Sequence, residues 1–303
     1  MTNLASTDPL AIRVEDVRRQ FARRSDMAGA EFLYGEVASR MFDRLKLIRL
    51  TPSAILDAGC GAGRRSMALL ERYRGAQLIG LDHCETALGL AQQTTRQPWL
   101  KHIAARLRNQ APKWICADLA KTTLGPESID LVWSNLALHW HPRPHDVLKE
   151  WSRILRPNGL AFFSGWGPAT GIEIRRAIEI AGLRTQTLPL VDMHDLGDIM
   201  VQHGFADPVM DQETLTLTYS QPEKLLADAQ ALGGNPTAGR KASLTSRQWR
   251  QRLCDGLLAQ ASAKGQLTLT LEIAYGHAWR SAIRRQDGET HFSLQAIKRR
   301  EIR

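Results

Sequence analysis

The chain has 303 residues, of which 43% are hydrophobic and 23% charged, and its formal net charge is +9 at pH 7. This composition is typical of a soluble globular protein and excludes a low-complexity chain. No apolar run is long enough for a membrane span, the N-terminus lacks a secretory signal, and the cysteines lack disulfide-like spacing, so we expect a cytoplasmic protein.

The first half of the chain alternates between strand and helix patterns. Two helical patterns come first, at about 13–24 and 29–46. The segments that follow are a strand AILDAG, a helix RRSMALLERY, a strand QLIGLD, a helix from about Glu85, strands KWICADL and SIDLVWSN, a helix at about 144–155, a turn RILRPNG and a strand LAFFSGW. This alternation predicts a parallel sheet with right-handed crossovers.

The rhythm changes after about residue 170. The segments there are a helix DMHDLGDIMVQHGF, a strand ETLTLTYS, a helix at about 222–232, a loop GGNPTAGRKAS, a helix from about Thr245 and a strand QLTLTLEIAYGHAW. Two late strands on either side of a helical insertion predict an edge pair added to the parallel sheet.

The segment ILDAGCGAG places Gly59, Gly61 and Gly63 directly after an apolar strand. A dinucleotide fingerprint needs its third glycine at position 64, where this chain has Arg64. The carboxylate of Asp57 would repel a pyrophosphate and attract a cation. S-adenosylmethionine carries an ammonium and a sulfonium, and the N–H groups of the loop and of the following helix can bind its carboxylate. We therefore predict a site for S-adenosylmethionine.

Two further acids follow the next two strands. Asp82 closes QLIGLD, where its carboxylate can accept hydrogen bonds from both ribose hydroxyls, and Asp118 closes KWICADL, where it can accept from the adenine amino group. Ligands bind at the carboxyl ends of the strands in open α/β sheets. The ordered set of three acids and three glycines is stronger evidence for this cofactor site than any one of these residues. Each of them alone is also common in ordinary turns.

These motifs, together with IDLVWSNLALHW and ILRPNGLAFFSGW, resemble those of class I S-adenosylmethionine-dependent methyltransferases over about residues 50–166. The resemblance implies a Rossmann-like, mostly parallel seven-stranded sheet with an antiparallel edge, and it adds Asn135 to the cofactor site. We expect an N-terminal helical lid at 1–48, a cofactor-binding core at 49–170, and a part at 171–303 with the edge strands and a helical insertion that covers the substrate.

The distal segments are similar to those of one methyltransferase family. SNLALHW, ALGGNPTAGRKASLTSRQWRQRL and LTLTLEIAYGHAW resemble the malonyl-acyl-carrier-protein O-methyltransferases of biotin biosynthesis, and FARR resembles their N-terminal motif. A neighbouring family, the arginine-hydroxylating assembly factors of respiratory complex I, shares some of these features. A protein-arginine hydroxylase and a non-catalytic cofactor-binding assembly protein are therefore the alternatives.

The chemistry of a malonyl acceptor makes few demands on the protein. Its carboxylate is already anionic near neutral pH, so the enzyme has to orient it and exclude water. An arginine suits that task, and we assign it to Arg240, with Arg23 and Arg24 as alternatives. A solvated arginine in a loop is the other interpretation of Arg240. His139 and Trp140 are assigned as walls beside the methyl group, with simple core packing as the alternative. We expect no metal site in HWHPRPH, because neither a cysteine nor an acid has ligand spacing there.

The positive charge suggests an acidic partner. An acyl carrier protein is strongly acidic, and arginines cluster near the start of this chain, with Lys298, Arg299, Arg300 and Arg303 near its end. A solvated basic surface is the simpler interpretation. A nucleic-acid target is less favoured, since the chain lacks the Asn/Asp-Pro-Pro-aromatic and Pro-Cys motifs of nucleic-acid methyltransferases.

Overall fold

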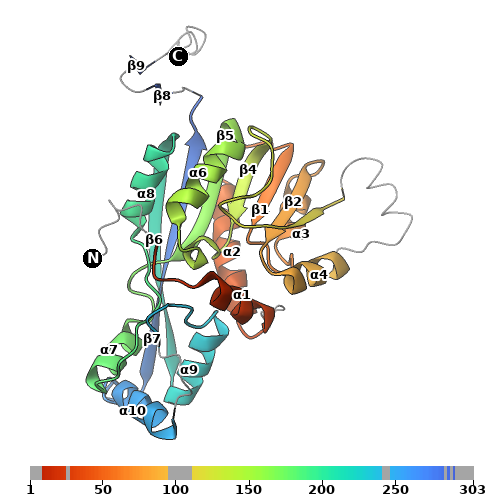
Figure 1. The fold of residues 1–303 in the computed structure, drawn as a ribbon. Helices are drawn as coiled ribbons and strands as arrows, with labels where there is room; N and C mark the ends of the chain where they lie inside the picture. The colour runs from red at the N-terminus through yellow and green to blue at the C-terminus, as the bar shows by residue number, and fades with distance from the viewer. Residues whose placement is uncertain are drawn as a thin grey trace.

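The computed structural model describes residues 9–24, 28–94, 111–240, 246–282, 285–286 and 289–290, and a seven-stranded sheet lies at its centre (Figure 1). The strand order is β3-β2-β1-β4-β5-β7-β6. The strands are β1 Ala54–Ala58, β2 Gln77–Asp82, β3 Lys113–Cys116, β4 Ile129–Ser134, β5 Leu155–Trp166, β6 Phe205–Tyr219 and β7 Leu267–Arg280, with β8 Arg285–Gln286 and β9 Glu289–Thr290 in a separate pair. The strands β1 to β5 are parallel, and β7 runs antiparallel to both β5 and β6. This topology confirms the expected class I methyltransferase fold.

Helices cover both faces of the sheet: α6 and α8 lie in front of it and α2 lies behind it in Figure 1. The helices are α1 Val14–Ala22, α2 Glu31–Leu45, α3 Ser66–Arg72, α4 Glu85–Thr94, the 3₁₀ turn η1 Leu138–Trp140, α6 Pro144–Ile154, α7 Ile172–Ile180, α8 Met193–Gln202, α9 Pro222–Ala231 and α10 Arg247–Leu258. Both α9 and α10 fall between β6 and β7, as the sequence predicted. No helix in the described ranges is long and apolar enough to cross a membrane.

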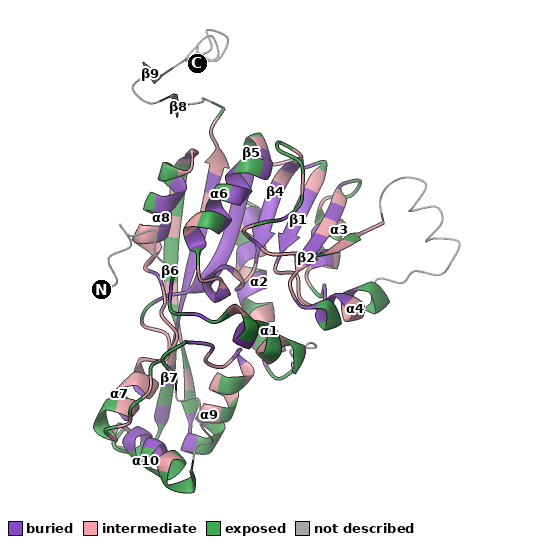
Figure 2. Ribbon diagram, in the orientation of Figure 1, coloured by how far each residue is buried: buried purple, intermediate pink, exposed green. Residues whose placement is uncertain are grey.

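The core includes two groups of packed aromatic side chains, one on each face of the sheet. Successive strand residues point to opposite faces, and Phe162 and Phe163 of β5 do so. Trp133 of β4 packs edge-on to Phe162, and Phe163 packs against Trp151 of α6. All four side chains are fully buried, and Figure 2 shows the central strands as mostly buried. The long apolar strand runs of the sequence are therefore explained by a sheet covered on both sides.

The hairpin of β6 and β7 extends past the carboxyl end of β5. Trp166, the last residue of β5, pairs with Ile273, while β7 begins at Leu267 and pairs with β6 from there. This overhang carries α7, α9 and α10 beyond the carboxyl ends of the parallel strands (Figure 1). The insertion thus lies on the side of the sheet where open α/β folds bind their ligands.

The structure differs from the sequence-based expectation in three elements. The turn expected at RILRPNG lies within β5, where Asn158 has a φ of 62° and the pairing register with β4 shifts. β6 starts at Phe205, ahead of the expected ETLTLTYS, because a second register shift near Asp207 and Pro208 breaks the alternation of its first half. The helix α7 was not predicted.

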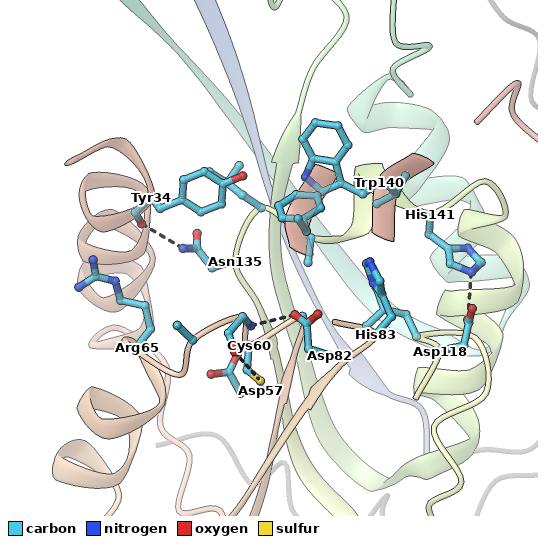
Figure 3. Close-up of a pocket in the computed structure, with 18 of the residues that line it drawn as sticks. Tyr34, Asp57, Cys60, Arg65, Asp82, His83, Asp118, Asn135, Trp140 and His141 are labelled. Carbon is cyan, nitrogen blue, oxygen red and sulfur yellow. Dashed lines mark hydrogen bonds and ion pairs between the residues drawn. The ribbon is translucent and has the colours of Figure 1, made fainter. Parts of the chain in front are cut away.

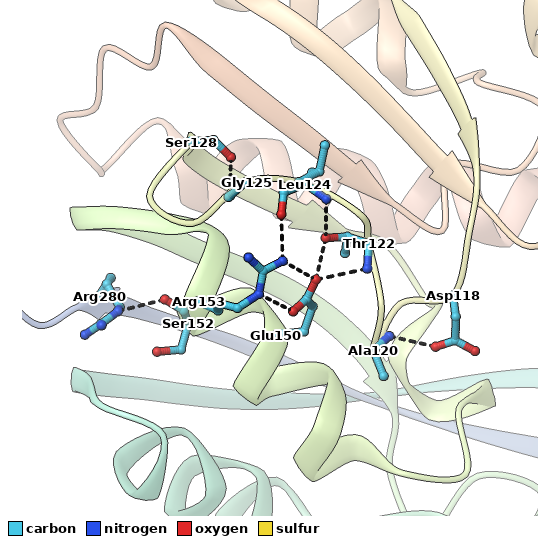
Figure 4. Close-up of polar contacts among 10 residues, drawn as sticks. All are labelled: Asp118, Ala120, Thr122, Leu124, Gly125, Ser128, Glu150, Ser152, Arg153 and Arg280. Atoms are coloured by element: carbon cyan, nitrogen blue, oxygen red, sulfur yellow. Dashed lines mark hydrogen bonds and ion pairs between the residues drawn. The ribbon is translucent and has the colours of Figure 1, made fainter.

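The loop that follows β3 is fastened to α6 by a buried carboxylate (Figure 4). Glu150 accepts hydrogen bonds from the backbone N–H of Thr122 at 2.9 Å and its hydroxyl at 2.6 Å. Arg153 donates to Glu150 through Nε at 2.7 Å and to the carbonyl of Leu124 at 2.7 Å. Since Asp118 lies at the start of this loop, the network helps to fix its position.

Candidate active site

A cavity lies at the carboxyl ends of β1, β2 and β4, between the glycine loop and the helices α1 and α2 (Figure 3). We call it the acidic cavity because four carboxylate side chains line it. These are Glu31, Asp57, Asp82 and Asp118. Glu31 pairs with the lining arginines Arg64 and Arg65, whereas none of the three aspartates pairs with an arginine or a lysine among the described residues.

Gly59 and Gly61 line the acidic cavity, whereas Gly63 lies outside it. Gly59 has a φ of 81°, and a Cβ there would approach the Cβ of Ala137 to 2.2 Å. Space is open around Gly61, so its backbone faces the cavity without a side chain. Gly63 instead packs under the loop, where a Cβ would lie 2.7 Å from the ring of Trp114. The third glycine therefore serves packing.

Asp57 is buried at the base of the glycine loop and accepts a hydrogen bond from Ser66 at 2.6 Å. Burial raises the pKa of its carboxyl to about 7, the hydrogen bond from Ser66 opposes this, and repulsion from Asp82 adds to it. A cationic ligand in the cavity would lower that pKa again, because it favours the charged form.

Asp82 is the last residue of β2, and Asp118 lies two residues past the end of the neighbouring strand β3. Asp82 accepts from the backbone N–H of Gly61 at 2.8 Å and of Cys84 at 2.9 Å, which holds its carboxylate at the mouth of the glycine loop. Asp118 pairs with His141 at 3.0 Å, and this hydrogen bond lowers the pKa of Asp118 to about 2. Both carboxylates retain lone pairs toward the cavity.

Asn135 lines the acidic cavity, but its side chain is used within the protein. Its Nδ2 donates to the carbonyl of Tyr34 at 3.0 Å, and its Oδ1 accepts from Ser164 at 3.0 Å. Tyr34 in turn donates its hydroxyl to the carbonyl of Leu232 at 3.2 Å. Asn135 therefore ties α2 to the end of β4, so any contact with a ligand is additional to this structural role.

Trp140 forms the wall between the acidic cavity and a second cavity, and it lines both. Its ring packs against Phe21 of α1 with 5.4 Å between centroids. His139 is buried behind this wall, in a small cavity of its own, and burial lowers its pKa to about 3. The structure thus places Trp140 at the site and His139 one layer further away, uncharged at neutral pH.

The second cavity, of about 510 Å³, lies under the insertion. We call it the arginine cavity, because four arginines and no acidic residue line it among the described residues. They are Arg23, Arg24, Arg175 and Arg240. The remaining walls are mostly apolar and come from α7, α10 and β7, including Ile174, Leu253 and Leu271. Such a cavity suits an anionic group on an apolar or flexible arm.

Arg240 lies in the arginine cavity, and its Nη2 forms an ion pair with Asp16 of α1 at 3.0 Å. Its Nε is buried without a hydrogen-bond partner among the described residues. The loop segments 241–243 and the basic cluster at the end of the chain lie outside the described residues.

Sequence reasoning missed several residues of the two cavities. His83, His141 and Glu31 line the acidic cavity, and Gln20 lines the arginine cavity. His83 has a usable signal, since it directly follows the strand-end Asp82. Gln20 and Glu31 have none, because their roles depend on how α1 and α2 pack across the sheet. Within the described residues no group of His, Cys, Asp and Glu can hold a metal ion.

Curated relatives resemble the chain over most of its length. A malonyl-acyl-carrier-protein O-methyltransferase from Laribacter hongkongensis is 41% identical over 257 residues, which are 84% of this chain and 85% of that protein. A protein of the same name from Gallionella capsiferriformans is 40% identical over 271 residues, 88% of this chain and 91% of its own length.

The core carries a known domain and a known fold. Residues 56–163 match the model of the methyltransferase domain family. The crystal structure of a putative methyltransferase from Bacillus halodurans covers 80% of this chain and 100% of its own length, with a TM-score of 0.55 and 13% identity. This likeness supports the fold alone.

Proposed function

Since the chain belongs to the malonyl-acyl-carrier-protein O-methyltransferases, a family of S-adenosylmethionine-dependent enzymes, we propose that it methylates the free carboxylate of a malonyl group on an acyl carrier protein. This is the first of the functions that the sequence suggested. S-adenosylmethionine supplies an electrophilic methyl group on a sulfonium sulfur.

One observation carries this proposal: a cavity lined by aspartates adjoins a cavity lined by arginines, with Trp140 as the common wall. The first fits a cationic methyl donor and the second an anionic acceptor. The arginine cavity would repel the side chain of a substrate arginine, which argues against the hydroxylase alternative.

The proposed reaction requires no proton transfer. A carboxylate oxygen of the acceptor forms a bond to the methyl carbon, the sulfur–methyl bond breaks, and its electron pair stays on sulfur. An anion and a cation thereby become a neutral ester and a neutral thioether. The protein has to align the two groups and exclude water. The uncharged His139, buried beside Trp140, is suited to support this wall and not to act as an acid.

We assign the cofactor contacts as the sequence suggested. Asp57 faces the positive charge, Gly59 and Gly61 allow close approach of the ligand to the loop, Asp82 accepts from the ribose and Asp118 from the adenine. Asn135 also lines the cavity but is held by Tyr34 and Ser164, and Gly63 supports the loop from outside the cavity. Within the segment 1–48 that we expect to act as a lid, the described helix α1 contributes Val14, Val17 and Phe21 to the cavity wall, which supports this role.

Two experiments test the proposal. The purified protein should transfer a labelled methyl group from S-adenosylmethionine to malonyl-acyl-carrier protein and leave acetyl-acyl-carrier protein, which lacks the carboxylate, unlabelled. The gene should also restore growth without biotin to a strain that lacks this methyltransferase. Labelling of a protein arginine, or hydroxylation of one, with no malonyl ester formed would overturn the proposal.

A further inference from the structure

One face of α1 and its C-terminal turn presents three polar side chains toward the arginine cavity. Asp16 and Gln20 are one helical turn apart and therefore neighbours on this face, and Arg24 follows just past the end of the helix. Gln20 and Arg24 both line the arginine cavity. Asp16 does not line the cavity, but it is buried and pairs with the lining residue Arg240. Gln20 thus stands one helical turn from the partner of Arg240 and four residues before Arg24.

Three residues that line the arginine cavity each have a buried polar atom without a hydrogen-bond partner among the described residues. These atoms are Oε1 of Gln20, Nη1 of Arg24 and Nε of Arg240. A buried N–H donor without a partner is unfavourable, and more so when the group is charged. A bound anion would supply an acceptor to the two unpaired guanidinium donors, and it would pair with Gln20 when the amide presents its N–H₂ in place of Oε1.

The position of Gln20 and Arg24 fits the reaction. Gly233 and Gly234 pass between Trp140 and α1: a Cβ on Gly233 would lie 2.4 Å from the Trp140 ring. A Cβ on Gly234 would lie 2.9 Å from Oε1 of Gln20 and 3.8 Å from Nη1 of Arg24. Gln20 and Arg24 therefore lie close to the wall between the two cavities, where the acceptor oxygen has to meet the methyl group.

We propose that Gln20 and Arg24, together with the Nε of Arg240, bind the acceptor carboxylate, and that Asp16 positions Arg240 for this contact. This inference rests on the proposed function and names the residues that select a substrate with a free carboxylate. Rotation of the Gln20 amide by 180° turns its N–H₂ toward the anion in place of Oε1. Burial and the neighbouring Arg23 both lower the pKa of Arg24, so an anion beside it relieves an unfavourable positive field.

The test compares variants with a malonyl and an acetyl thioester of pantetheine. For Arg24→Ala and Gln20→Glu we expect kcat/KM for malonyl-pantetheine to fall about a hundredfold, and Arg24→Lys to recover part of it. Inhibition by acetyl-pantetheine and calorimetric affinity for S-adenosylmethionine should stay unchanged in all three. Arg18→Ala is the matched control, because Arg18 is exposed on the same helix and lines neither cavity.

Two outcomes would overturn the assignment. Near-normal kcat/KM in both Arg24→Ala and Gln20→Glu would exclude these side chains as carboxylate ligands. Equal weakening of the malonyl and acetyl thioesters would mean that the substitutions only deform the cavity. Failure of the wild-type protein to methylate any malonyl thioester is a different result and would refute the proposed function itself.

Discussion

Asp57 carries a pKa of about 7 in a cavity that we assign to a cationic ligand, and burial is the main cause of this raised pKa. Below pH 7 the carboxyl gains a proton and loses the charge that attracts the ligand. We therefore expect the Kd for S-adenosylmethionine to rise by up to about tenfold per pH unit as the pH falls through 7, and to level off above it. Calorimetry between about pH 6 and 7.5 measures this.

Asp57→Asn serves as the control for the pH prediction, because an amide of the same shape does not titrate. The variant should bind S-adenosylmethionine more weakly and with no pH dependence in this range. If it keeps the slope of the wild type, another group is responsible, and His83 in the same cavity is the first candidate.

Asp82 allows a second residue-scale prediction. Its carboxylate is held by two backbone N–H groups at the mouth of the glycine loop. Asp82→Ala should weaken S-adenosylmethionine binding by about 1.5–3 kcal/mol, the cost of losing charge-assisted hydrogen bonds. Calorimetry with an unchanged affinity would remove the ribose assignment. Tight binding of NADH by the wild type would contradict the whole cofactor assignment.

At the scale of elements, α1 and the loop before α10 are joined into one unit. The hydroxyl of Thr237 donates to the carbonyl of Ala11 at 2.9 Å, the backbone N–H of Ala238 donates to the same carbonyl at 2.8 Å, and Arg240 pairs with Asp16. The expected lid over the acidic cavity is therefore fastened to the insertion that carries the arginine cavity. We therefore expect that a ligand bound in one cavity also orders the elements that line the other cavity.

Because Arg240 takes part in these contacts, substitutions of Arg240 test two roles, binding of the acceptor and attachment of α1. If Arg240 holds the acceptor carboxylate, Arg240→Ala should lower turnover about a hundredfold and leave S-adenosylmethionine affinity intact, with partial rescue in Arg240→Lys. Asp16→Asn is the comparison, since it removes the ion pair but keeps the arginine. Equal losses of turnover and of cofactor affinity in Arg240→Ala and Asp16→Asn would mean that Arg240 acts only by fastening α1.

The elements that the sequence predicted well are those with a strong period or a glycine motif. The strands before Asp57, Asp82 and Asp118 are continuous apolar runs, and the structure has a strand at each. The first half of β6 escaped prediction because a register shift near Asp207 interrupts its alternation. Gln20 escaped as a site residue because a helical pattern does not reveal which other element faces each side of the helix.

At the scale of the whole molecule, the two cavities carry opposite charge although the chain as a whole is strongly basic at +9. The aspartates lie at the ends of the sheet strands, whereas the arginines come from the turn after α1, from α7 and from the insertion loop. The overhang of β6 and β7 carries α7 and the insertion beyond the carboxyl ends of the parallel strands (Figure 1), where α1 also lines the acidic cavity. An acidic carrier protein that delivers its arm to the arginine cavity would therefore approach basic elements.

Association with such a partner should depend on ionic strength. Charges on exposed surfaces are screened beyond about 10 Å at 0.1 M salt, and steering by them acts mainly on the association rate. Exposed arginines of α1 such as Arg18 and Arg19 are well placed to contribute. We expect the association rate with malonyl-acyl-carrier protein, measured by stopped-flow fluorescence, to fall markedly between low and moderate salt. Methylation of malonyl-pantetheine, which carries no acidic protein, should change little and serves as the control.

An association rate that does not depend on salt would reject electrostatic docking. Tight binding of duplex DNA with a steep salt slope would favour a nucleic-acid partner instead.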